Sequence, residues 1–308
     1  MSEKQYKVIV TKNKYTKREA REHRQGYLFL MPAIIVTGIF IGLSVFFIIY
    51  LSFHKVNLFA KTYQLVGLKN YIRVFNDDTV RIAFRNTLVF ALVVVPAQTV
   101  ISLVIASVLN SKIRGKMIFR TIYFLPTLTS SSALTLIFMF SVSGPINAAL
   151  IKAGIISTGI NFLQDSSFAL KVIMIMNIWS TVPYYMTLYL ATLQDLPNSL
   201  YEAAEIDGAN SFKKFAYITE PYLKPMTSYV LLTSIIGTLQ MFDQAYIFSN
   251  GSGGPANSTL TVALIIYKYA FGTQNAMGFA ATLAIILAVI ILLLSLLSQK
   301  ISKSESLY

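Results

Sequence analysis

The chain has 308 residues, of which 55% are hydrophobic and only 13% are charged, with a formal net charge of +13. A soluble globular protein carries about 25% charged residues, so this composition excludes an ordinary soluble domain and indicates an integral membrane protein. The absence of cysteine excludes disulfides and thiolate metal sites, and two histidines, His23 and His54, are too few to indicate a metal centre.

Residues 1–26 form a basic segment that we expect to be cytoplasmic, because eight Lys and Arg residues crowd it. Such a cluster could attract nucleic-acid phosphates. Before a membrane span, however, it usually fixes orientation and contacts anionic lipid heads. We therefore predict contact with membrane lipid and no nucleic-acid partner. The apolar run that follows lacks a small-residue cleavage pattern, so we expect it to remain as an anchor.

Six charge-poor windows are long enough to cross a bilayer, because about 20 residues at 1.5 Å per residue cover its ~30 Å core. They are residues 27–53, 86–111, part of 121–151, 172–194, 226–248 and part of 269–299. Only Asp243 interrupts the fifth window. We predict an all-α integral membrane fold, with six transmembrane helices in residues 27–299 and a cytoplasmic tail, residues 300–308.

The loop charges set the orientation. With a cytoplasmic amino terminus, the inner segments hold 17 of the 26 Lys and Arg residues and the outer segments hold 9. Inner loops are richer in Lys and Arg, so both termini are predicted to be cytoplasmic. The first outer loop, residues 54–85, carries six of the nine outer residues and contains a predicted interfacial or lid helix within 68–85. The outer segment 250–257, NGSGGPAN, is a predicted turn.

The long inner loop, residues 195–225, predicts two short helices. Ser199 and Glu202 have capping-box spacing for a helix from Leu200 to Ile206, which Gly208 would end. Asn210 or Ser211 would cap a second helix that stops before Pro221. Small alanines and large aromatic residues in this loop favour docking to a partner. The alternative is a surface helix that packs on its own protein.

Residues 202–209 read EAAEIDGA and are followed by Phe215, Ile218, Pro221 and Pro225. This string closely resembles the EAA loop of the permease subunits of bacterial ATP-binding-cassette (ABC) importers. It departs from that family at Glu220, where a leucine is usual. The resemblance implies a type I importer permease fold, and a role in coupling to the ATPase for Glu202, Ala203, Ala204, Asp207, Gly208, Ala209, Phe215 and Pro221.

Three further stretches resemble the sugar-permease branch of that family. They are residues 65–87, Arg120 with 123–126, and Gln240, Phe242 and Asp243 with 253–255. The resemblance implies a multi-pass protein of the bacterial cytoplasmic membrane that imports a sugar, first of all an oligosaccharide. The implied partners are a second permease, a cytoplasmic ATPase dimer that binds ATP and Mg²⁺, and an extracytoplasmic solute-binding protein. No phosphate-binding G-x-x-x-x-G-K-[ST] motif occurs, so we expect no cofactor in this chain and no catalytic residues.

Polar residues inside the predicted spans are candidates for the substrate path, because such groups face a cavity or another helix. The fourth span offers Asn177, Trp179, Thr181 and Tyr184, and Asn177, Thr181 and Tyr184 share one helical face. The stretch resembles that of the maltose-permease branch, which has asparagine and tryptophan at the matching places and uses it in sugar contact, so the resemblance favours Asn177 and Trp179 as cavity-lining residues. Gln240 and Asp243 are the candidates in the fifth span. The alternative is that these groups only join neighbouring helices.

Other functions remain open at this point. Glycerol phosphate or another polyol is the alternative cargo of the same importer type, although the spans lack the Arg and Lys residues that a phosphate favours. An ion-coupled carrier would usually have several intramembrane ionisable residues. A membrane-embedded transferase would need grouped acids or histidines near one face.

Overall fold

The structure is a computed structural model that describes residues 17–57, 62–111, 115–272 and 275–304. The chain divides into two compact units, Met1–Tyr50 and Leu51–Tyr308. Residues 1–16 of the predicted basic segment and residues 305–308 of the predicted tail lie outside the described part.

The first unit is one long helical segment. Helix α1, Lys17–Thr37, continues through a π turn, Gly38–Leu43, into α2, Ser44–Ser52. Most of its large apolar side chains are exposed, among them Phe29 and Phe40. Hydrocarbon or another helix must cover such a surface, which agrees with the first predicted span.

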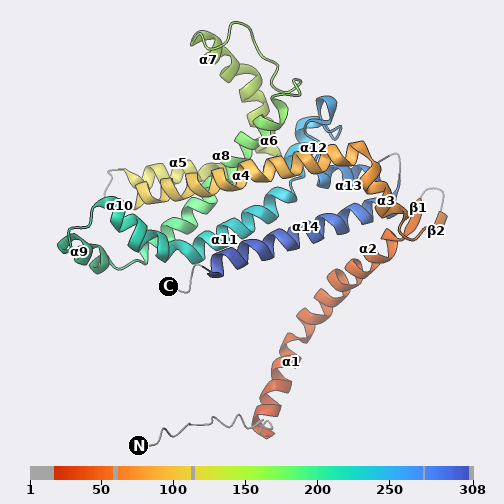
Figure 1. The fold of residues 1–308 in the computed structure, drawn as a ribbon, viewed down its shortest axis with the longest axis horizontal. Coiled ribbons are helices and arrows are strands. Elements are labelled where there is room, and N and C mark those ends of the chain that lie inside the picture. Colours follow the sequence, from red (N-terminus) through yellow and green to blue (C-terminus); the bar gives the residue numbers. More distant parts are fainter. Residues whose placement is uncertain (1–16, 58–61, 112–114, 273–274, 305–308) are drawn as a thin grey trace, which may run out of the picture. The chain divides into compact units, whose positions relative to one another are not determined.

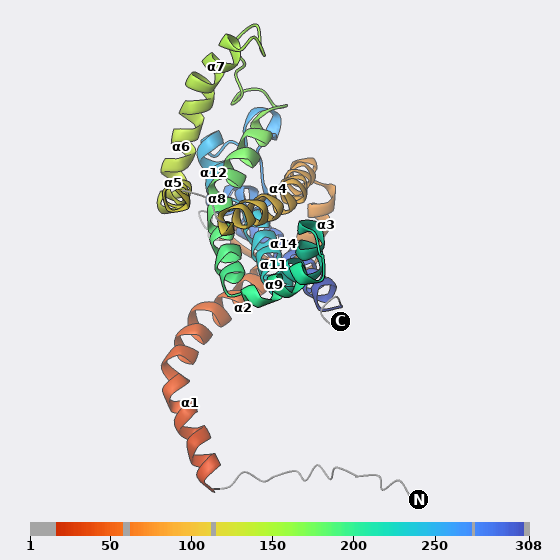
Figure 2. The same cartoon turned by 90° about the vertical axis from the view of Figure 1, so that its left-hand side faces the viewer.

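The second unit is a helix bundle (Figures 1 and 2). Helix α4, Asp78–Asn110, packs against α8, Ala169–Gln194, and against α11, Glu220–Leu239. Helix α14, Met277–Ser304, packs on α11 and on α13, Val262–Phe271. Apolar side chains of all these helices are buried between them, including Phe90, Ile173, Leu264, Leu283 and Val230.

The third predicted window folds as several helices. Helix α5, Lys116–Leu128, ends just after Pro126, and α6, Ser131–Ser141, begins after Ser130, whose hydroxyl accepts the Ala133 amide hydrogen. A π turn, Val142–Ile146, and α7, Asn147–Lys152, continue α6. Proline near a helix end and a serine cap together explain the break.

A two-stranded hairpin and a short helix occupy the predicted first outer loop. Strand β1, His54–Asn57, pairs antiparallel with β2, Thr62–Leu65, so that Val56 lies opposite Tyr63. Helix α3, Lys69–Asn76, follows and leads into α4. The short helix expected in this loop is therefore present, and the hairpin is a small addition to an otherwise helical fold.

The fifth predicted span is interrupted. Helix α11 ends at Leu239, and a separate helix α12, Asp243–Ser249, follows. The expectation that Asp243 lies within one continuous span is therefore wrong. The backbone is non-helical at Phe242, and the freed carbonyl of Met241 accepts the Thr261 hydroxyl at 2.9 Å. An acidic residue is favourable in the first turn of a helix, where Asp243 lies.

The predicted turn at residues 250–257 is confirmed. Gly251, Gly253 and Gly254 have positive φ angles, and a 3₁₀ turn, Pro255–Asn257, closes the segment. At Gly254 a Cβ would meet the Thr259 hydroxyl at 2.5 Å, so this position requires glycine.

Four helical segments of the described chain combine the length and hydropathy of a membrane span. They are Arg21–Ser52, Asp78–Asn110, Ser131–Lys152 and Met277–Lys300. Helix α8, with 26 residues, reaches about 39 Å at 1.5 Å per residue but is more polar. The count of six spans and the cytoplasmic termini therefore stay predictions.

Candidate functional site: the coupling loop and a polar cavity

The coupling loop, residues 195–225, joins α8 to α11 and begins with helix α9, Asn198–Ile206, which Gly208 terminates as predicted. Gly208 has φ +73°, a left-handed conformation that glycine adopts without strain. The Gly208 amide donates to the Glu205 carbonyl at 3.0 Å, and the Ala209 amide donates to the Ala204 carbonyl at 2.8 Å. These two bonds form a Schellman motif, which satisfies the last carbonyls of the helix.

The start of α9 differs from the prediction. The helix begins directly after Pro197, and no side chain caps it, so the expected capping box of Ser199 and Glu202 is wrong. Ser199 lies inside the first turn, because the extended backbone of Pro197 already precedes a helical Asn198. The second cap is confirmed: the Asn210 side chain accepts the Lys213 amide hydrogen at 2.9 Å.

The second helix does not stop before Pro221. Helix α10, Ser211–Lys214, passes through a π turn, Phe215–Thr219, directly into α11. Pro221 lies in the first turn of α11, and the wider π turn before it relieves the clash that a proline ring makes with an α-helical turn. The two parts of the loop are therefore one short helix and the beginning of a long one.

The surface of this loop is largely exposed. No side chain of α9 or α10 is buried, and Ile206, Phe212 and Tyr217 are 87%, 76% and 80% exposed. Of the predicted coupling residues, six are exposed and Ala204 and Ala209 are partly buried; the exposed ones are Glu202, Ala203, Asp207, Gly208, Phe215 and Pro221. Exposed large apolar side chains beside small ones suit a partner surface.

Two side-chain contacts brace the loop from within. The Lys214 ammonium lies 2.5 Å from the Glu205 carboxylate, and the Tyr201 hydroxyl lies 2.6 Å from the hydroxyl of buried Thr219. The hydrogen bond from Lys214, together with its charge, holds the pKa of Glu205 below its ordinary value. The first contact ties α9 to α10, so the exposed face is held in one shape.

A polar cavity of about 320 Å³ lies among α5, α6, α8 and α12. Most of the lining residues carry a hydroxyl or amide group, and none of them is charged. The lining residues are Pro126, Thr127, Thr129, Ser131, Leu134, Thr135, Ser180, Thr181, Tyr184, Tyr185 and Gln244. The Ser131 hydroxyl is buried with no hydrogen-bond partner, so the wall contains an unused polar group.

Two of the predicted path residues line this cavity, namely Thr181 and Tyr184. The Thr181 hydroxyl lies 2.6 Å from the Oε1 atom of buried Gln98, and the Tyr184 ring meets the Tyr185 ring edge to face at 5.4 Å. Asn177 is buried and does not line the cavity; its main-chain carbonyl oxygen lies 2.7 Å from the Thr181 hydroxyl, whose single hydrogen is shared between this oxygen and Gln98.

The other path residues lie outside the cavity. The Trp179 ring packs 6.2 Å from the Phe138 ring and is 40% exposed. Gln240 and Asp243 are exposed at the break between α11 and α12. Sequence reasoning missed Gln244, which follows Asp243 and reaches the cavity because the chain starts a new helix there.

Residues 98–304 match the family described as "Binding-protein-dependent transport system inner membrane component". The match covers more than half of the chain and includes the coupling loop and the cavity helices. The chain belongs to this family. The permease is thus a transport subunit and a multi-pass inner membrane protein, because the members of this family are the membrane subunits of ABC importers and carry no ATP site of their own.

Its relatives place the permease on the sugar branch. It is 38% identical over 275 residues to the lactose transport system permease protein LacF of Rhizobium radiobacter, covering 88% of this chain and 92% of LacF. It is 31% identical over 295 residues to the trehalose/maltose transport system permease protein MalF of Thermococcus litoralis, covering 94% and 98%.

The fold agrees with this assignment. A chain of a bacterial alginate ABC transporter, solved in complex with an alginate pentasaccharide-bound periplasmic protein, superposes with a TM-score of 0.77. The match has 19% identity and covers 94% of this permease and 98% of that chain, so it supports the fold alone. The predicted type I importer fold is confirmed. No group of three His, Cys, Asp or Glu side chains able to hold a metal occurs in the described part of the chain.

Proposed function

We propose that this permease imports a neutral oligosaccharide, together with a second permease, a cytoplasmic ATPase dimer and an extracytoplasmic solute-binding protein. In this proposal the ATPase binds residues 195–225 and thereby moves the spans between inward- and outward-facing states. ATP and Mg²⁺ would bind to the ATPase subunits.

The chemistry of the polar cavity carries the choice of cargo. Hydroxyl and amide groups can exchange hydrogen bonds with sugar hydroxyls, and the rings of Tyr184 and Tyr185 can cover sugar C–H faces. A phosphorylated polyol would need cations at its phosphate, and no lining residue is charged. The names of the relatives, which transport lactose and trehalose or maltose, support the same class.

The shape of the coupling loop supports the proposal that a separate ATPase drives transport. Its exposed apolar side chains, Ile206, Phe212 and Tyr217, stand on a braced pair of helices, and one of these helices continues as α11. A partner that binds this face therefore acts directly on a core helix of the bundle. The residues with the proposed coupling role are those predicted above.

The test measures uptake by the whole transporter reconstituted in vesicles. ATP is supplied on the side of the ATPase subunits, and the solute-binding protein is supplied on the opposite side. Labelled disaccharides and trisaccharides are compared with labelled glycerol 3-phosphate. We expect ATP-dependent uptake of at least one neutral sugar. Preferred uptake of glycerol 3-phosphate would contradict the proposed neutral-sugar cargo. Uptake without the ATPase would contradict the proposal that the ATPase drives transport.

A matched pair of variants tests the path. Thr181→Val removes a hydroxyl from the cavity wall and leaves the amide oxygen of Gln98 without its partner, so we expect uptake to fall about tenfold while the ATPase still co-purifies. Thr187→Val makes the same change where the hydroxyl bonds only the Pro183 carbonyl, and should leave uptake near normal. If the two variants lowered uptake equally, the substrate path would not run through this cavity. Trp179→Ala should lower uptake less, because its ring packs outside the wall.

A further inference from the structure

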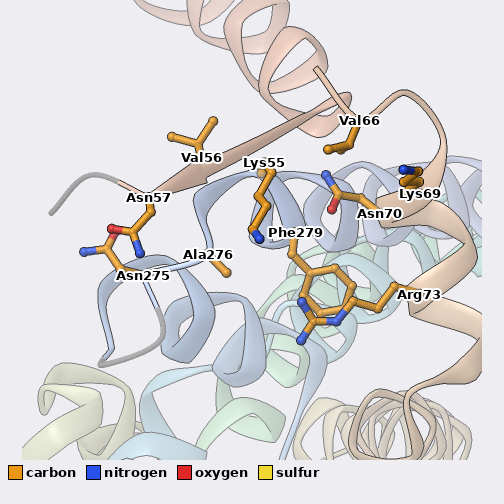
Figure 3. A pocket seen from close by; sticks show the side chains of 11 residues that line it. Lys55, Val56, Asn57, Val66, Lys69, Asn70, Arg73, Asn275, Ala276 and Phe279 are labelled. Carbon is orange, nitrogen blue, oxygen red and sulfur yellow. The ribbon is translucent and has the colours of Figure 1, made fainter. Parts of the chain in front are cut away.

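A second cavity, of about 280 Å³, lies where β1, α3 and the first turn of α14 meet (Figure 3). Three cationic side chains line it, namely Lys55, Lys69 and Arg73, and no acidic side chain does. Buried Asn70 stands between the two basic residues of α3 and forms part of the wall. The cavity is therefore a basic hollow built from two neighbouring segments, β1 and α3, and from the start of α14, which is distant from them in sequence.

The positive charge of this hollow is not neutralised from within. Lys55 and Lys69 have no ionic partner among the described residues, and Arg73 lies against an aromatic ring, 4.2 Å above the centre of Phe279. The neighbouring carboxylate, Asp77, does not line the hollow; it accepts the amide hydrogens of Thr79 and Val80 and the Tyr269 hydroxyl. An anion in the hollow would thus meet three cations and no acidic side chain in the wall.

The frame of the hollow is fixed. The Asn70 amide group donates to the carbonyls of Ser52 and His54 at 2.8 and 3.0 Å. At Gly278, also on the wall, a Cβ would collide with the His54 carbonyl oxygen, so β1 and α14 approach as closely as their backbones permit. The amides in the first turn of the 28-residue α14 add further positive potential to that of the side chains.

The exposed apolar face of α3 indicates that the hollow lies at the membrane boundary. Leu68, Ile72 and Phe75 have the spacing of one helical face along α3, and each is at least 60% exposed. The next helix, α4, contains one of the segments able to span a bilayer. A short helix with an exposed apolar face and flanking basic residues lies in the interface, with its apolar face among the acyl chains and its cations at the phosphates.

We propose that this hollow binds the phosphate headgroup of an anionic membrane lipid, whose acyl chains lie along Leu68, Ile72 and Phe75. Lys55, Lys69 and Arg73 would hold the phosphate, and the exposed face of α3 would hold the chains. The apolar face beside the cations favours a lipid over a free phosphate. The hollow is separate from the polar cavity, because the two share no lining residue.

The test uses the full transporter, purified in detergent and offered an equal mixture of phosphatidylglycerol and phosphatidylcholine. Native mass spectrometry measures how much of each lipid stays bound. We expect the double variant Lys55→Gln/Lys69→Gln to weaken retention of phosphatidylglycerol about thirtyfold, because each lost surface charge weakens it about fivefold. Lys55→Arg/Lys69→Arg keeps the charges and should retain the lipid.

The control is Lys152→Gln/Lys171→Gln, which removes the same charge from two other exposed positions and should retain phosphatidylglycerol. Equal losses in the two double glutamine variants would overturn the site, since net charge alone would then explain binding. Displacement of the lipid by 10 mM inorganic phosphate would overturn the lipid as occupant. Co-purification of the ATPase confirms that each variant is folded.

Discussion

Two regions, one at each end of α4, are built differently: the coupling loop, and the hairpin with α3. The coupling loop buries no side chain of α9 or α10, and few side-chain hydrogen bonds join it to anything but itself. At the end with the hairpin and α3, polar side chains instead bond backbone carbonyls of other segments. Asn70 bonds the carbonyls of Ser52 and His54, and Asn86 bonds the carbonyls of Asn257 and Leu260.

This difference indicates different tasks. A segment proposed to bind another subunit should keep its contact surface exposed and its own shape braced, and the coupling loop has both properties. A segment that closes the bundle keeps its backbone polar groups satisfied by buried side chains, since an unsatisfied one would be costly next to lipid. Substitutions at the two ends should therefore fail in different ways: coupling is lost at one end and stability at the other.

The largest effect is expected at Gly208. Gly208→Val puts a β-branched side chain at φ +73°, which costs about 1–2 kcal/mol and breaks the Schellman motif at the tip of the loop. We expect uptake to fall more than tenfold and the ATPase to dissociate during purification, while the thermal midpoint of the permease is unchanged. Gly208→Asn tolerates this conformation and should keep most uptake. An equally inactive Asn variant would argue against the backbone explanation.

At the opposite end, Gly278→Ala should lower stability instead. The added Cβ would strike the His54 carbonyl, and overpacking of this kind costs about 1–3 kcal/mol. We expect a lower thermal midpoint in detergent and normal ATPase association. Gly237→Ala, in α11, is the control, since nothing lies within 4 Å of the added atom. If both variants were equally stable, the tight packing of β1 on α14 would be contradicted.

A loss of stability is also expected at Asn86. Asn86→Ala removes two hydrogen bonds and leaves the carbonyls of Asn257 and Leu260 without this donor, at a cost of about 2 kcal/mol. Chemical denaturation measures the change. Asn76→Ala removes one exposed bond to the preceding turn and should change stability little. A loss of coupling without loss of stability in Asn86→Ala would reverse the proposed division of tasks.

The smallest effect concerns the Glu205–Lys214 pair. Because the pKa of Glu205 is lowered when the pair forms, the pair stabilises the loop above the ordinary pKa of a glutamate, and this contribution disappears as pH falls through the lowered value. Both groups contact solvent, so the effect is small. Uptake measured as a function of pH should weaken slightly more in acid for the native chain than for Glu205→Gln. Identical profiles would exclude a role for the pair in coupling.

The sequence was informative where one residue type decides a local conformation. Gly208 ended its helix and Asn210 capped the next one as expected, because each acts through its own backbone or its nearest neighbours. Pro221 misled the prediction, since the π turn before it, which no spacing reveals, lets the helix continue. The break at Gln240–Phe242 also depends on a distant group, the Thr261 hydroxyl.

The polar cavity was harder to predict, because its wall also depends on groups that are distant in sequence. Thr181 and Tyr184 could be found from their helical spacing, whereas Gln244 reaches the wall only because a new helix starts at Asp243. The basic hollow could not be predicted, because Lys55, Lys69 and Gly278 meet only through the hairpin and the start of α14. The functional roles of all these residues stay predictions.

The unbroken path from Ser211 to Leu239 has a mechanical consequence. These 29 residues form one helical rod of about 43 Å, from the proposed ATPase contact to the break at Gln240. A rigid rod carries a displacement of one end to the other undiminished, and α12 with Gln244 begins three residues beyond that far end. A shift of the coupling loop by a few ångströms would therefore be carried along the rod to the break at Gln240–Phe242, directly before the helix that holds the wall residue Gln244.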